Sequence, residues 1–140
     1  MKTGLMMFLL AVVLLLVATV AWVRLAPLDA ERWHRLPDEL EAGDQSNGAI
    51  RVVDAGEDAL MRLDDIIRTT PRTEWLAGSV EDRMLTYVTR SAGFGFPDYT
   101  TVRWRNGALE VFGRARYGLS DLGVNAARID GWLNALRQGG

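Results

Sequence analysis

The feature that most constrains this chain is an uncharged apolar run near its amino terminus. Leu5 to Val23 is 19 residues long, consists mostly of Leu, Val, Ala and Met, and is flanked by Lys2 and Arg24. As a helix this run would be about 29 Å long, which matches the thickness of one bilayer hydrocarbon core. We therefore predict a membrane anchor over residues 1–24 and a membrane contact through residues 5–23.

A cleaved signal peptide is the alternative interpretation of the same run. The apolar region of a signal peptide usually has about 7–15 residues and is followed by a small-x-small cleavage site. Here the run is longer, and Thr19-Val20-Ala21 offers only a weak cleavage site. These features favour an uncleaved anchor. The flanking charges leave its orientation open, because Lys2 and the α-amine stand on one side and three arginines follow on the other.

The composition of the remaining chain excludes several classes of site. The sequence has no cysteine and a single histidine, His34, so it can form no disulfide, no thiolate zinc site and no His-rich metal cluster. We expect neither a metal nor a cofactor. A net charge of −2 argues against a nucleic-acid-binding protein.

The small net charge hides an asymmetry along the chain. Residues 25–82 carry 14 Asp and Glu against 6 Arg, whereas residues 83–140 carry 8 Arg against 4 Asp and Glu. Either the two halves fold against each other and neutralise, or the basic half presents a face that binds a ligand. We favour neutralisation.

The segment after the anchor predicts a linker and then a helix. Residues 25–49 contain Pro and Gly among acidic residues and no apolar period, which predicts a juxtamembrane linker. Asp54 with Glu57 resembles a capping box, so we predict that a helix starts near Asp54 and ends before Pro71. The domain is then expected to span residues 50–138.

Four strands and a second helix are predicted to follow. The strands are expected over residues 73–80, 83–90, 99–105 and 108–116, and Asn106-Gly107 is a strong hairpin signal. A helix follows Ser120-Asp121, carries an apolar stripe around Trp132, and ends at Gly139-Gly140. This order predicts an α+β fold: a transmembrane helix, then a small domain of order helix, four antiparallel strands, helix.

The stretch from Arg114 to Arg128 is the strongest candidate for a binding site. Outward arginines at the end of a strand precede a glycine-bearing turn and a helix start, a combination that favours anions. The alternative, which we favour, is a structural latch in which Asp121 pairs with Arg114 or Arg116. No P-loop or dinucleotide spacing is present. The candidate anion-binding residues are Arg90, Arg114, Arg116, Ser120, Asp121 and Asn125.

At these residues the chain resembles the family called domain of unknown function 1499. The family's hallmark is similar to Arg-Ser-Arg-x-Gly-x-Ser-Asp-x-Gly-x-Asn-x-x-Arg, and residues 114–128 match it except for Ala115 at the Ser position. A second block, Gly95-Phe-Pro-Asp98, and residues 24–34 also resemble the family, in its alphaproteobacterial form. The resemblance covers roughly residues 22–137. It implies a single-pass protein of the bacterial inner membrane with its C-terminal domain in the periplasm, and it implies no reaction.

These observations support three hypotheses about function. The leading one is a non-catalytic, membrane-anchored envelope domain that binds a small anionic ligand or an envelope protein through its basic strand-turn-helix corner. An envelope hydrolase is the first alternative, although Ser120 has no evident base. A structural or assembly factor is the second, and it would need no pocket. An open cleft beside Arg114 and Asp121 would favour binding.

Overall fold

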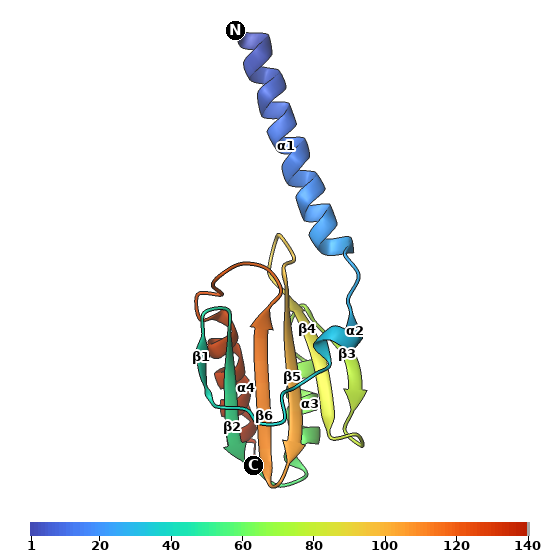
Figure 1. Ribbon diagram of the computed structural model, residues 1–140, viewed down its shortest axis with the longest axis vertical. Helices are drawn as coiled ribbons and strands as arrows, with labels where there is room; N and C mark the ends of the chain where they lie inside the picture. The colour runs from blue at the N-terminus through green and yellow to red at the C-terminus, as the bar shows by residue number, and fades with distance from the viewer. Residues whose placement is uncertain (140) are drawn as a thin grey trace.

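A computed structural model describes residues 1–139 as a long helix joined to a six-stranded sheet with helices on one face (Figure 1). Helix α1 (Lys2–Leu25) projects away from the domain and is exposed to solvent over nearly its whole length. Its most apolar window of 18 residues has a mean hydropathy of 2.8. By length and composition α1 can cross a membrane, which fits a membrane anchor or a signal sequence.

The sheet is antiparallel throughout, with the strand order β1-β2-β6-β5-β4-β3. Its strands are β1 (Gly43–Gln45), β2 (Gly48–Asp54), β3 (Thr73–Ser79), β4 (Met84–Arg90), β5 (Pro97–Arg105) and β6 (Ala108–Ala115). The α+β fold is thus confirmed, and the four predicted strands correspond to β3, β4, β5 and β6. The hairpin turn at Asn106-Gly107 is also confirmed, because both residues have positive φ.

The strand count differs from the prediction, since β1 and β2 come from residues assigned to the linker and to the start of the first helix. Strand β2 pairs with β6 from Gly48, opposite Arg114, to Asp54, opposite Ala108. Asp54 therefore ends a strand, and helix α3 (Ala59–Arg68) begins after Asp58 instead. The capping-box prediction was wrong because this pairing joins distant parts of the chain, which local periodicity cannot reveal.

The hydrophobic core lies between the sheet and two helices, α3 and α4 (Val124–Gln138), which lie behind the sheet in Figure 1. Its members on α4 include Ile129, Trp132 and Leu133, as the apolar stripe predicts. A Cβ atom on Gly113 of β6 would lie 2.9 Å from the Cδ1 atom of Ile129, so glycine permits the close approach of α4. Helix α4 ends at Gln138, and Gly139 is its C-cap; Gly140, also predicted to follow it, lies outside the described residues.

The opposite face of the sheet is covered by the chain between α1 and β1 (Figure 1). This covering segment, residues 26–42, contains the short helix α2 (Ala30–Trp33). The Trp33 ring stacks on the Tyr99 ring of β5 with centroids 4.1 Å apart, and His34 Nδ1 lies 2.8 Å from Thr86 Oγ1. Contrary to the linker prediction, these residues pack on the sheet and belong to its second covering layer.

Candidate functional site

Outward-facing arginines on β5, on β6 and just after β6 hold the covering segment on the sheet. Each donates a hydrogen bond to a main-chain carbonyl of that segment, and we call this set the arginine clasp. Its bonds run from Arg103 to Pro37 (3.0 Å), Arg105 to Asp38, Arg114 to Trp33 (2.6 Å) and Arg116 to Pro27 (3.0 Å). These arginines occupy positions that the sequence predicts to face solvent, but they contact the covering segment instead.

Arg114 is the most deeply buried arginine of the clasp, with 8% of its surface exposed. Its guanidinium also donates to Thr101 Oγ1 at 2.9 Å and to the carbonyl of Phe112 at 3.0 Å, and it lies over the Phe112 ring. No carboxylate in residues 1–139 forms an ion pair with it. Burial lowers the pKa of Arg114 to about 10. The group is still a cation at neutral pH, held by carbonyl dipoles and ring faces.

The neutralisation predicted from the charge asymmetry takes an unexpected form. In the clasp, arginines of the basic half bind carbonyls, not carboxylates, of the acidic half. The clasp's own carboxylate is Glu110 of β6, buried beneath the covering segment, which pairs with Arg103 at 2.6 Å and Arg105 at 3.3 Å. Glu110 thereby fixes the position of these two guanidinium groups.

Asp121 does not pair with Arg114 or Arg116, as the latch interpretation expected. Its carboxylate accepts hydrogen bonds from the Gly123 amide at 2.9 Å, the Asn125 amide at 3.0 Å and Asn125 Nδ2 at 2.9 Å. Partial burial tends to raise the pKa of Asp121, but these hydrogen bonds outweigh that effect and hold the pKa below its usual value. Asp121 therefore caps the start of α4, and buried Asn125 anchors that cap to the helix.

The structure does not bring the six predicted site residues together around one opening. Arg114 and Arg116 belong to the clasp, and Asn125 is buried. Ser120 and Asp121 line an open depression of about 340 Å³ whose other polar groups include the Asp98 carboxylate. No arginine in residues 1–139 lines this depression. Of its two carboxylates, Asp98 pairs with Arg128 at 3.2 Å, whereas Asp121 forms no ion pair in the described residues and disfavours an anion there.

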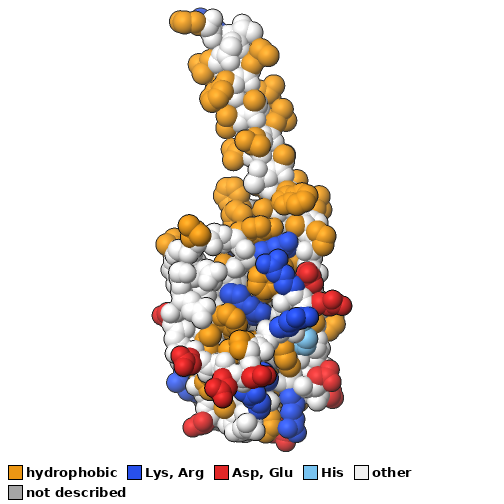
Figure 2. All heavy atoms as spheres, in the orientation of Figure 1, with side chains coloured by type: hydrophobic (Ala, Val, Ile, Leu, Met, Phe, Trp, Pro, Cys, Tyr) orange, Lys and Arg blue, Asp and Glu red, His pale blue; other side chains and the backbone are white. Residues whose placement is uncertain are grey.

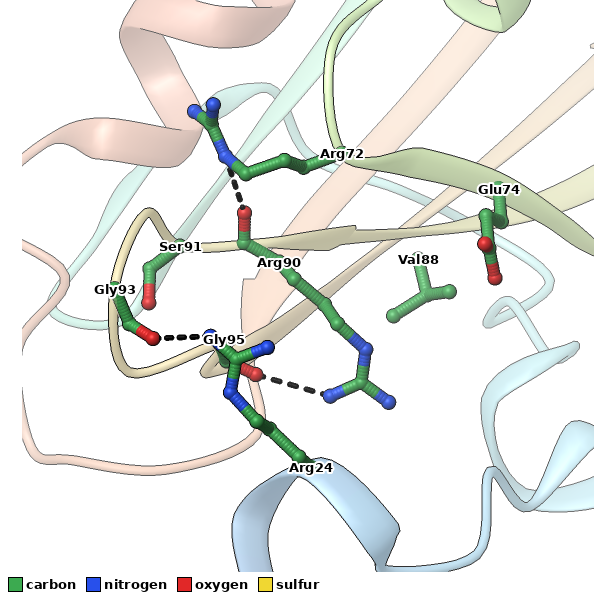
Figure 3. A pocket seen from close by; sticks show the side chains of 8 residues that line it. All are labelled: Arg24, Arg72, Glu74, Val88, Arg90, Ser91, Gly93 and Gly95. Atoms are coloured by element: carbon green, nitrogen blue, oxygen red, sulfur yellow. Dashed lines mark hydrogen bonds between the residues drawn. The ribbon is translucent and has the colours of Figure 1, made fainter. Parts of the chain in front are cut away.

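Arg90 lies in a different pocket, at the junction of α1 with the domain (Figure 3). This arginine pocket has a volume of about 200 Å³ and is lined by Arg24, Arg72, Glu74, Val88, Arg90, Ser91, Gly93 and Gly95. Arg24 comes from the last turn of α1, Arg90 from the end of β4, and Arg72 from just before β3. The guanidinium groups of Arg24 and Arg90 thus lie together at the pocket, which Arg72 and the Glu74 carboxylate also line.

The hydrogen bonds of these arginines leave their charge unneutralised. Arg90 donates to the carbonyls of Gly95 at 2.9 Å and Val23 at 3.4 Å, Arg24 donates to the Gly93 carbonyl, and Arg72 Nε donates to the Arg90 carbonyl at 3.0 Å. None of the three forms an ion pair within residues 1–139. In Figure 3 the side chains of Arg24 and Arg90 converge near Gly95, whereas the Arg72 guanidinium points away from them. The pocket therefore concentrates positive charge with unused N–H donors.

Gly95 is required where Arg24 crosses the β4–β5 loop. Its φ of +76° lies in the region that favours glycine, and an added Cβ atom would lie 3.1 Å from Arg24 Cγ. The sequence analysis identified Arg90 but missed Arg24, Arg72 and Glu74. A signal was available, because the predicted pairing of residues 73–80 with 83–90 places Arg72 beside Arg90.

The match to a known family covers most of this architecture. The family described as "Protein of unknown function (DUF1499)" matches residues 29–136, which include the whole sheet, α3 and nearly all of α4. No curated protein matches the chain. Because the family match covers more than half of the sequence, the chain belongs to the DUF1499 family of proteins of unknown function.

Proposed function

We propose that this protein is a membrane-anchored, non-catalytic domain that binds a phosphate-type anion in the arginine pocket. The observation that carries the proposal is that three arginines without ion pairs in residues 1–139 line one pocket, where the guanidinium groups of Arg24 and Arg90 converge, at the end of a helix that can span a membrane. Guanidinium groups match the oxygens of phosphate by paired hydrogen bonds. The proposed ligand is still a small anion, as expected from the sequence. The proposed site is the pocket of Arg90 instead of the corner between Arg114 and Asp121.

The surroundings of Ser120 support a non-catalytic role. Its hydroxyl oxygen accepts a hydrogen bond from the Leu122 amide at 3.2 Å, and no imidazole or carboxylate within the described chain hydrogen-bonds to it. A serine nucleophile needs a neighbouring base to remove its proton. His34 cannot serve, since its Nδ1 lies against Thr86 on the sheet.

We also propose that α1 holds the protein in the bacterial inner membrane as a single-pass anchor, with the domain in the periplasm. The length and apolarity of α1 support the anchor. The resemblance to membrane-attached members of the family supports export, since the flanking charges give no clear preference.

Single cysteines test this topology, because the natural chain contains none. We expect a membrane-impermeant maleimide, applied to intact cells with a permeabilised outer membrane, to label Gln138→Cys. Thr3→Cys should react only after the inner membrane is opened. Labelling of Thr3→Cys but not Gln138→Cys in intact cells would reverse the proposed orientation.

Phosphate titration tests the arginine pocket in the full-length protein. At constant ionic strength, phosphate should raise the melting temperature progressively with the logarithm of its concentration above Kd, since a ligand at a hundred times its Kd stabilises by about 2.7 kcal/mol. Arg90→Gln should weaken phosphate binding about tenfold or more, because one charge-assisted hydrogen bond contributes at least about 1.5 kcal/mol. Isothermal titration calorimetry in detergent micelles measures the two dissociation constants.

Arg137→Gln is the matched control, because Arg137 lies near the far end of α4 and, within residues 1–139, its side chain hydrogen-bonds only to the carbonyl of Leu133. It should leave phosphate affinity unchanged. Nanodiscs with and without phosphatidylglycerol distinguish free phosphate from a lipid headgroup as the bound anion. If the pocket binds the headgroup, phosphatidylglycerol will compete with free phosphate. Equal phosphate affinity in wild type, Arg90→Gln and Arg137→Gln would refute the pocket as the site.

A further inference from the structure

We infer that the end of the domain next to α1 inserts into the bilayer and contacts lipid directly. This membrane-side face consists of Phe94 and Phe96 in the β4–β5 loop, and of Leu119, Leu122 and Val124 between β6 and the first turn of α4. The inferred partner is the surface of a membrane with anionic phospholipids. The inference needs α1 to span that membrane, and it does not depend on anion binding in the arginine pocket.

The two phenylalanines lie beside the part of α1 that would be within the bilayer. Phe94 and Phe96 stack with ring centroids 5.7 Å apart. They line one groove with side chains of the last three turns of α1, namely Leu16, Thr19, Val20 and Val23. Because the apolar run extends from Leu5 to Val23, side chains that line one groove with Leu16 lie at the depth of the run. If α1 spans a membrane, the loop that carries both rings must enter it.

The connection between α1 and the domain fixes this arrangement. Val23 and Ala26 are already buried against the domain, so no free spacer separates the end of the helix from the sheet. The Arg90 guanidinium donates to the Val23 carbonyl, and that of Arg24 donates to the Gly93 carbonyl. These bonds tie the β4–β5 loop to the helix end. The domain therefore sits directly at the membrane surface.

The β6–α4 loop supplies the second apolar contact. Leu119 and Leu122 are 93% and 91% exposed, the highest values among the large apolar side chains after Met1. In Figure 1 this loop lies at the same end of the domain as the β4–β5 loop and the base of α1. Leu122 also has a φ of +54°, an unusual conformation for leucine. Neither leucine packs in the domain core, and lipid at this end would remove both from water.

The charges near this end suit an anionic membrane surface. Arg24, Arg90 and Arg116 all lie at the end of the domain from which α1 emerges. Figure 2 shows arginines gathered just below the helix, while most acidic side chains on the visible face lie farther from it. Apolar residues flanked by arginines are typical of segments that bind the interface of anionic bilayers. Contact with a second copy of the chain would not require arginines around an apolar surface.

Spin labels measure the depth of this face in the full-length protein, reconstituted in vesicles of phosphatidylcholine and phosphatidylglycerol without free phosphate. Nitroxides are attached to Phe94→Cys, Leu119→Cys or Leu122→Cys, one per protein. We expect each label to collide more often with oxygen, which concentrates in the bilayer, than with a water-soluble nickel chelate. Because Leu119 and Leu122 are almost fully exposed, their replacement should not disturb folding.

Met61→Cys is the matched control, since Met61 is 53% exposed and Phe94 is 54% exposed. Met61 lies in the first turn of α3, following the end of β2 that points away from α1 (Figure 1). Its label should remain accessible to the nickel chelate. A label at Leu10 reports whether α1 itself lies within the bilayer. If Leu10 were embedded in lipid while Leu119 and Leu122 stayed accessible to water, the inferred lipid contact would be wrong and the membrane anchor would still stand. Strong dipolar broadening between labels at Leu122 would instead identify a second copy as the partner and would also overturn it.

Discussion

Replacing Arg114 with methionine is expected to destabilise the domain by about 3 kcal/mol and to release the covering segment from the sheet. Methionine fills much of the same space but donates no hydrogen bond, so the carbonyls of Trp33 and Phe112 lose a charged donor under the covering segment. Hydrogen bonds to charged groups contribute about 1.5–3 kcal/mol each, and removal of the buried charge offsets part of the loss. Urea unfolding followed by circular dichroism measures the free-energy change.

Arg116→Met provides the control for this experiment. Arg116 donates to the segment through one bond, to the Pro27 carbonyl, and it is more exposed than Arg114. Because this bond is exposed to water, replacement of Arg116 should cost at most about 1.5 kcal/mol, the lower end of the range for hydrogen bonds to charged groups. Amide hydrogen exchange over residues 33–38 should accelerate in Arg114→Met and hardly change in Arg116→Met. An Arg114→Met protein with the parent's stability and exchange rates would show that stacking of Trp33 on Tyr99 is sufficient to hold the segment.

The clasp should not respond to pH in the physiological range. Burial lowers the pKa of Arg114 in the folded protein to about 10, well below its ordinary value in the unfolded chain. Between these two values the unfolded chain binds more protons than the folded one, so stability would rise with pH only in that alkaline window. Below about pH 10 both states carry the charge, and Arg114 adds no pH dependence. Arg114 therefore holds the covering segment as a constant cation at neutral pH and is not a pH switch.

The parts of the fold that the sequence predicts are those with a local signal. Strands β3 to β6 and helix α4 carry alternating or helical apolar periods, and Asn106-Gly107 specifies its turn. Strand β2 was missed because Asp54 and Glu57 imitate a helix start, while the strand is defined by its distant partner β6. Contacts with distant residues outweigh local preferences at such positions.

The candidate site was only partly predictable for a related reason. Outward arginines on strands usually face solvent, and nothing in the local pattern of residues 26–42 indicates that this irregular segment covers them. The arginine pocket combines α1, the residue before β3 and the end of β4, which are widely separated in sequence. Of its three arginines, the sequence analysis selected only Arg90. Charge counting identified the basic half but not the main-chain carbonyl groups that all four clasp arginines bind.

Replacing Trp132 with alanine is expected to cost about 3–5 kcal/mol, the usual range for removing a fully buried aromatic side chain. Trp132 on α4 is 6% exposed and belongs to the core between the sheet and both helices. Its Nε1–H also donates to Thr70 Oγ1 at 2.8 Å, just after the end of α3. The substitution would therefore leave a cavity and separate α4 from α3. Since small domains are stable by only about 5–15 kcal/mol, much of the total stability would be lost.

Trp75→Ala is the matched control, because it removes the same side chain from β3, where Trp75 is 50% exposed. The Trp75 Nε1–H donates to the Gly78 carbonyl, so both tryptophans lose one hydrogen bond, and the two substitutions differ mainly in burial. Trp75→Ala should cost about 1 kcal/mol, the net contribution of that bond. Urea unfolding of the full-length protein in detergent, followed by circular dichroism of the sheet, compares the variants. Equal unfolding midpoints for both would mean that α4 contributes little to the core, against the packing of Ile129, Trp132 and Leu133 on the sheet.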